Sequence, residues 1–169
     1  MSRLPVSSEL NKIAKAINRS EGRGILVGGA VRDHFMDRRV SKDLDVEVFG
    51  LSMEKLESVL EQFGNIHAVG KSFGVLKLKT TTAEYDFSLP RREKKTGKGH
   101  RGFNITTDPL MSFKEAASRR DFTVNSMGYD LLENTLLDPF EGVEDIKYKK
   151  LRHVGPAFAE DPLRVFRAM

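Results

Sequence analysis

The chain has 169 residues, 39% of them hydrophobic and 31% charged, which is enough apolar material for one domain with a hydrophobic core. It has no cysteine, which excludes disulfides and thiolate metal sites, and no apolar run near the roughly 20 residues that span a bilayer, so we expect no membrane partner. The N-terminus also lacks the apolar core of a secretory signal. These features predict a cytoplasmic protein.

The spacing of apolar residues, with capping and turn residues between them, predicts the elements of secondary structure. In chain order we expect a helix over residues 7–18, a strand over 24–27, a helix over 30–36, a strand over 43–48, a helix over 51–63, strands over 73–79 and 83–89, a basic loop over 91–101, a helix that starts at 108–109 and runs to 118, a hairpin of 129–132 with 136–137, a helix over 143–147 and a last helix over 161–169.

The first strand runs into a pair of glycines, Gly28 and Gly29, directly before a helix. Backbone N–H groups are free at such a helix start, and glycine allows a phosphate to come close to that backbone. Arg32, in the first turn of the helix, can add a charge-assisted contact to a phosphate oxygen. This stretch therefore predicts a phosphate-binding turn.

The strand over 43–48 carries acids at alternating positions, Asp43, Asp45 and Glu47, separated by Leu44 and Val46. With the apolar residues toward the core, the three acids project from the other face, about 7 Å apart at each step. Such clustering is electrostatically costly unless a cation lies among the acids, and Mg²⁺ binds through one or two carboxylates together with substrate phosphates. A phosphate-binding turn followed by a metal-binding strand predicts a site for a nucleoside triphosphate.

Two further segments have a functional and a plain interpretation. Asp86, in the strand over 83–89, is either another metal ligand, if that strand lies beside the acidic one, or a surface aspartate. Residues 91–101 hold six lysines and arginines against one glutamate, a local charge of +5 that exceeds the net charge of +4 of the whole chain. We expect a mobile surface loop that either attracts polyanions or is simply solvated.

Five motifs appear in order: LVGGAVRD, DLDVE, RRDFTVNSM, DPFEG followed by Asp145, and AEDPLRVFRA. Together they resemble the motifs of the class II tRNA nucleotidyltransferase and bacterial poly(A) polymerase family, within the polymerase-β nucleotidyltransferase superfamily. The resemblance implies an α/β fold of the α+β type, a mixed sheet of about five strands flanked by helices. It also implies a head domain over residues 1–150, and the start of a helical neck domain over 151–169 that continues in a longer protein.

The resemblance also implies site residues. Asp43 and Asp45 match the catalytic, metal-binding aspartates, and Asp86 matches the position of a third, less uniform acid. The nucleotide-binding positions are Gly28, Gly29, Arg32, Arg120, Asp121, Asn125, Asp161, Arg164 and Arg167. The candidate RNA contacts are Arg91, Arg92, Lys94, Lys95, Lys98 and Arg101.

The activity that the resemblance implies is template-independent addition of nucleotides to the 3′ end of tRNA, with two Mg²⁺ ions as cofactors and ATP and CTP as substrates. The addition is either complete, as CCA, or restricted to C or A. Two alternatives remain open: a bacterial poly(A) polymerase, with the same chemistry on another RNA, and a catalytically silent RNA-binding module. The intact Asp43, Asp45 and Arg32 argue against the silent module.

Overall fold

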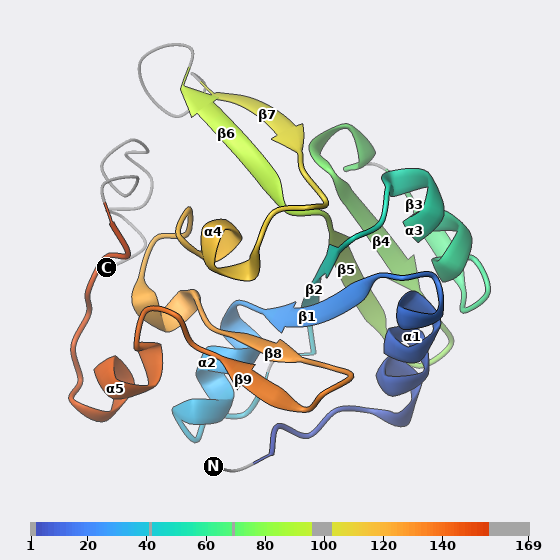
Figure 1. Cartoon of the computed structure of the whole chain (residues 1–169). Helices are drawn as coiled ribbons and strands as arrows, with labels where there is room; N and C mark the ends of the chain where they lie inside the picture. Colours follow the sequence, from blue (N-terminus) through green and yellow to red (C-terminus); the bar gives the residue numbers. More distant parts are fainter. Residues whose placement is uncertain (1–2, 41, 69, 96–102, 156–169) are drawn as a thin grey trace.

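The computed structural model describes residues 3–40, 42–68, 70–95 and 103–155, with the backbone alone for 93–95 and 103–105. Its centre is a mixed sheet of seven strands, with helices on both faces, and a separate two-stranded ribbon projects from it (Figure 1). The expected α/β class with a mixed sheet is confirmed, with seven strands in place of about five. No helix in these ranges has both the length and the apolar character needed to cross a membrane.

The bounds of the elements follow the sequence closely in the first half of the chain and less closely in the second. They are α1 (Ser8–Arg19), β1 (Arg23–Val27), α2 (Gly29–Phe35), β2 (Leu44–Phe49), α3 (Met53–Leu60), β3 (Asn65–His67), the 3-10 turn η1 (Lys71–Phe73), β4 (Val75–Lys79), β5 (Glu84–Ser88), β6 (Arg91–Lys95), β7 (Phe103–Thr107), α4 (Phe113–Ala117), the 3-10 turn η2 (Thr123–Asn125), β8 (Gly128–Asp130), β9 (Thr135–Leu137) and α5 (Gly142–Lys147).

The strand order in the large sheet is β3-β4-β5-β2-β1-β8-β9. β2 pairs with β1 in antiparallel orientation and with β5 in parallel orientation, whereas the other pairings in this sheet are antiparallel. A parallel neighbour requires a crossover connection, which α3, β3 and β4 supply here. The crossover brings the acidic strand beside the strand that carries Asp86.

Helices α1 and α3 cover one face of the large sheet, and the hydrophobic core lies between these helices and the sheet (Figure 1). The apolar side of α1 is fully buried, and Ser7 caps the helix by accepting a hydrogen bond from the backbone N–H of Leu10 at 3.1 Å. Val46 and Val48 of β2 face this core, as their alternation with the acids predicts. Their burial fixes the opposite face of β2 as the one that carries Asp45 and Glu47.

The opposite face is also covered, by α4. The ring of Phe113 lies against β8 so closely that a Cβ added at Gly128 would come within 2.6 Å of it. The same ring meets the ring of Phe49 edge-on, with 6.2 Å between centroids. This cover explains why Glu47, expected on an exposed face, is only 8% exposed. Alternation predicted which side of the strand Glu47 occupies, but burial of that side depends on the later helix.

Two expectations from the sequence are wrong, and two strands were not expected. The helix expected from 108–109 begins only at Phe113, where the Ser112 hydroxyl accepts from the N–H of Glu115 at 3.1 Å, and Asp108 caps a turn instead. Residues 91–95 of the basic segment form β6, paired with β7, and not a loop. The three-residue strand β3 and the strand β7 were not expected.

Candidate functional site

The glycine turn and the acidic strand meet at the end of β1. Gly28 has φ +75° and ψ −142°, a conformation close to one that essentially only glycine adopts. A Cβ added there would lie 3.8 Å from the Oδ2 atom of Asp45, because Val27 and Asp45 are paired in the β1–β2 register. The structure therefore brings the predicted phosphate-binding turn against the predicted metal-binding carboxylate.

Asp86 lies beside Asp45, since the two are register partners in the parallel β2–β5 pair. Burial raises the pKa of Asp45, the Asp86 carboxylate raises it further, and Arg120 opposes both; Asp43 adds a smaller increase. The Nζ atom of Lys77, opposite Asp86 on β4, lies 3.5 Å from its Oδ1 atom. The two acids thus repel each other, and Lys77 relieves part of that repulsion.

The same group of acids fits a hard divalent cation. Oδ1 of Asp86 is buried without a hydrogen-bond partner in the described structure, and Asp45 is held among like charges. In the described ranges, no group of three or more acidic, histidine or cysteine side chains is arranged to hold a metal ion by itself. Mg²⁺ does not need one, because it retains waters and binds through one or two carboxylates with substrate phosphates. Asp43 and Asp45 would supply these, with Asp86 as a further ligand.

Arg32 is held in place from two sides beside the glycine turn. Its Nε atom donates to Oδ1 of Asp33 at 3.0 Å, and its Nη1 atom donates to Oδ1 of Asn125 at 2.9 Å. The Nδ2 atom of Asn125 donates in turn to Oδ1 of the buried Asp121 at 3.1 Å. A Cβ added at Gly29 would lie 3.3 Å from Nη2 of Arg32. Three of the predicted nucleotide-binding residues are therefore joined by hydrogen bonds, and Gly29 lies beside them.

Arg120 reaches the site from the segment after α4, and its partner was not predicted. Its Nη2 atom lies 4.0 Å from Oε2 of Glu47, whose side chain is 10% exposed. Burial raises the pKa of Glu47, while the positive charges of Arg120 and Arg91 oppose that shift. The alternation of acids in β2 had placed Glu47 on the correct face, but no spacing in the sequence relates it to Arg120.

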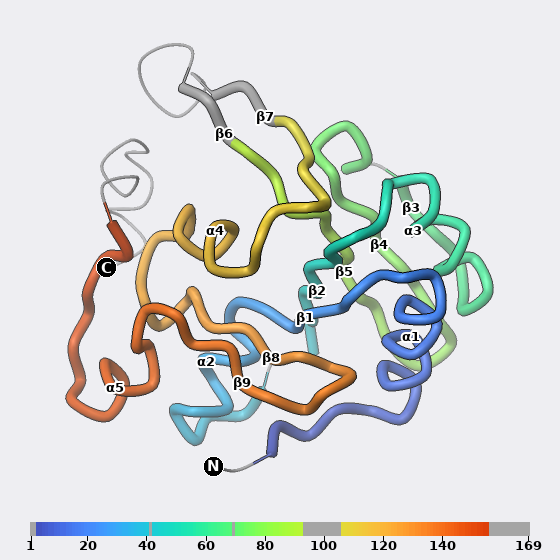
Figure 2. The backbone as a smooth tube through the Cα atoms, viewed as in Figure 1, coloured from blue at the N-terminus to red at the C-terminus, as the bar shows by residue number. Residues whose placement is uncertain are grey.

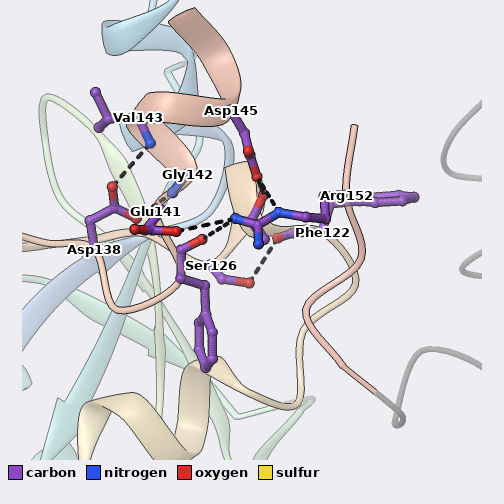
Figure 3. Close-up of polar contacts among 10 residues, drawn as sticks. Phe122, Ser126, Asp138, Glu141, Gly142, Val143, Asp145 and Arg152 are labelled. Atoms are coloured by element: carbon purple, nitrogen blue, oxygen red, sulfur yellow. Dashed lines mark hydrogen bonds and ion pairs between the residues drawn. The ribbon is translucent and has the colours of Figure 1, made fainter. Parts of the chain in front are cut away.

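The last described segment is bonded to the RRDFTVN motif. The N–H of Thr123 donates to the carbonyl of Arg152, the N–H of Val154 donates to that of Asp121, and the two stretches run side by side (Figure 2). Asp145 of α5 accepts from the Thr123 hydroxyl and, at 3.0 Å, from Nε of Arg152 (Figure 3). Asp145, which follows the DPFEG motif, therefore joins α5 and the last described segment to the RRDFTVN motif.

Asp138 stabilises the start of α5 in this support. Its two carboxylate oxygens accept from the N–H groups of Gly142 at 2.6 Å and Val143 at 3.0 Å (Figure 3). A Cβ added at Gly142 would lie 2.5 Å from the carbonyl oxygen of Thr123, so glycine permits the close approach of α5 to η2. These contacts explain the Asp and Gly of the motif as structural residues.

The basic segment contacts the rest of the described chain through its first two arginines, Arg91 and Arg92. Arg92 binds Asp108 at 2.9 Å and also Glu115 of α4, so its guanidinium is already engaged by two acids. Arg91 donates to the carbonyl of Phe73 at 3.4 Å. Only the backbone of Lys94 and Lys95 is described, on β6. The predicted site residues outside the described ranges are Lys98, Arg101, Asp161, Arg164 and Arg167.

Comparison with known proteins gives one family and a consistent set of relatives. The family model described as the poly A polymerase head domain matches residues 25–152. The chain is 46% identical over 143 residues to a multifunctional CCA protein of Stenotrophomonas maltophilia, and 43% identical over 146 residues to one of Xylella fastidiosa. The matches cover 85% and 86% of this chain but 33% of each relative, so the chain spans about a third of their length.

Solved structures agree with this result. The Bacillus stearothermophilus CCA-adding enzyme in complex with CTP superposes with a TM-score of 0.77 at 29% identity, covering 95% of this chain and 37% of that one. A tRNA nucleotidyltransferase complexed with a primer tRNA and an incoming ATP analogue gives 0.72 at 32% identity, covering 92% and 43%. The architecture above is the one that these enzymes share.

Proposed function

This chain belongs to the poly A polymerase head domain family, as the class II tRNA nucleotidyltransferases do, and we propose that it carries the nucleotidyl-transfer site of an enzyme that adds nucleotides to the 3′ end of tRNA. The observation that carries the proposal is the meeting of Gly28 with Asp45 and Asp86 at one end of the sheet. The tRNA acceptor is favoured over another RNA because the relatives are CCA proteins.

The substrates that we propose are CTP and ATP. The Gly28-Gly29 backbone and Arg32 would bind the triphosphate, with Arg32 oriented by Asn125. Mg²⁺ bound by Asp43 and Asp45, with Asp86 as a further ligand, would activate the 3′-hydroxyl of the RNA and neutralise charge on the leaving pyrophosphate. No nucleophilic side chain of the protein is needed, because the attacking group belongs to the RNA.

The wider assignments follow from the same proposal. Residues 1–150 would form the head and residues from 151 the start of the neck, to which Asp161, Arg164 and Arg167 would contribute nucleotide contacts. A cytoplasmic location would suit tRNA as the substrate.

The test uses the full reading frame that contains this chain. The protein is incubated with Mg²⁺ and a tRNA transcript that ends at the discriminator base, with CTP alone, ATP alone or both. Addition of two C residues and one A establishes a complete CCA enzyme, C alone or A alone a partial one, and a long A tail on any RNA a poly(A) polymerase.

Two variants make this test specific to the site. Asp45→Ala should abolish addition, whereas Glu84→Gln should not, because Glu84 is an exposed carboxylate on β5 that pairs with Lys79, at 3.8 Å. If wild type and Asp45→Ala are equally inactive with every substrate, the proposal is wrong and the silent RNA-binding module is favoured.

A further inference from the structure

Glu47 is an unusual residue for the interior of a sheet. It shares a face of β2 with Asp45 and is much the more buried of the two, 8% exposed beneath the cover that α4 provides. Its register partner on β1 is the fully buried Ile25. An apolar residue would suit such a position better, since a buried carboxylate loses hydration.

The contacts of Glu47 do not compensate for its burial. Oε2 lies 4.0 Å from Nη2 of Arg120, and Oε1 is buried with no hydrogen-bond partner among the described residues. A buried ion pair with imperfect geometry contributes little net stability, and its replacement by apolar residues is often neutral or stabilising. Stability of the fold therefore does not account for Glu47.

The neighbouring Arg120 better explains why a carboxylate occupies position 47. Its side chain is 29% exposed, so the guanidinium is more accessible than the Glu47 carboxylate that it faces. Its charge acts on both Glu47 and Asp45, two positions apart on the same face of the strand. Without Glu47, Asp45 would be the remaining acid of that face near the Arg120 guanidinium. An arginine paired with Asp45 would compete with any cation that Asp45 binds.

We propose that Glu47 is a positioning residue that holds the Arg120 guanidinium over β2, away from Asp45 and directed at the incoming nucleotide. This inference rests on the proposed function, because it takes Arg120 as a nucleotide contact. Glu47 itself touches neither nucleotide nor metal; it acts through Arg120.

The test is a double-mutant cycle in the full-length enzyme with Glu47→Gln, Arg120→Ala and the double variant. Calorimetry with CTP and with ATP gives the Kd, tRNA extension gives kcat and KM, and thermal unfolding gives Tm. Glu47→Gln should raise Kd and KM about tenfold, the size expected for one charge-assisted contact, with a smaller change in kcat. It should add nothing in the Arg120→Ala background.

A second variant and a control separate positioning from folding. Glu47→Leu should weaken nucleotide binding as Glu47→Gln does while leaving Tm unchanged or higher, because it removes a buried unpaired oxygen. Glu84→Gln, at an exposed position of β5, should change neither the Tm nor the Kd. Additive effects of Glu47→Gln and Arg120→Ala, or a lower Tm with unchanged Kd and KM, would overturn the inference.

The calorimetric arm also distinguishes this inference from the proposed function. If the wild type extends no RNA but binds CTP or ATP, the proposed function fails while the cycle in Kd still decides the role of Glu47. If the wild type binds neither nucleotide, both fail.

Discussion

Replacing Gly28 by alanine tests the phosphate-binding turn most directly. The residue has φ +75° and ψ −142°, where a side chain costs about 1–3 kcal/mol of backbone strain. The added Cβ would lie 3.8 Å from Oδ2 of Asp45, which is ordinary contact, so steric overlap adds nothing. We expect the free energy of unfolding to fall by about 1–3 kcal/mol, measured by urea denaturation.

The effect on activity should exceed the effect on stability. The methyl group would occupy the space between the Gly28 backbone and Asp45, where the proposed function places the triphosphate and its divalent cation. A displacement of about 1 Å in bound substrate is enough to reduce the rate about 100-fold. We therefore expect kcat/KM for CTP and ATP to fall at least 100-fold at a temperature where the variant remains folded.

Gly50→Ala is the matched control. Gly50 also has positive φ, +89°, and a Cβ there would lie 2.9 Å from the carbonyl oxygen of Glu21, so this variant should be destabilised at least as much. It follows the end of β2 opposite to Asp45, however, and should keep its kcat/KM while folded. Equal losses of activity in the two variants would refute the assignment of the Gly28 turn to phosphate binding.

Two other predictions concern the support of the site. Burial raises the pKa of Asp145, but the hydrogen bond from Thr123 and the charge of Arg152 outweigh it and lower the pKa below the ordinary value. The stabilisation is therefore present above about pH 4 and lost as the pH falls through the folded-state pKa. Asp145→Asn should cost about 1–2 kcal/mol at pH 7 and little near pH 2, measured by thermal unfolding; a pH-independent difference would contradict this. Gly128→Ala should cost about 1–3 kcal/mol by overpacking against Phe113, and Phe113→Leu should restore part of it, as urea denaturation of the three variants would show.

Local signals in the sequence predicted the first half of the fold well. Serine caps are read from a few neighbouring residues: the Ser52 hydroxyl accepts from the N–H of Lys55 at 3.3 Å, and α3 begins at Met53, two residues after the expected start. The failures are non-local. β6 is a strand because β7 pairs with it from beyond the intervening segment, and the basic composition of residues 91–95 contains no signal of that partner.

The site residues also divide into those predicted from local signals and those that depend on non-local contacts. The glycine turn and the alternating acids were predicted from the residues themselves, because both depend on local geometry. The contact between Arg32 and Asn125 joins positions 93 residues apart, and only the resemblance to a family had suggested both as site residues. Glu47 ends the DLDVE motif, but its contact with Arg120 was missed because Arg120 belongs to a segment 73 residues later in the chain.

The parallel pairing of β2 with β5 brings Asp45 beside Asp86, and the repulsion between these two acids opposes folding. Had β5 paired in the antiparallel direction with a different register, Asp86 would not lie beside Asp45, and the acids would not repel one another. The raised pKa of Asp45 shows that ionisation of this group opposes folding as the pH rises through that pKa. A bound divalent cation would reverse the sign of this contribution, because it favours the charged carboxylates of the folded state. The sheet order thus creates an electrostatic cost that a bound divalent cation is suited to relieve.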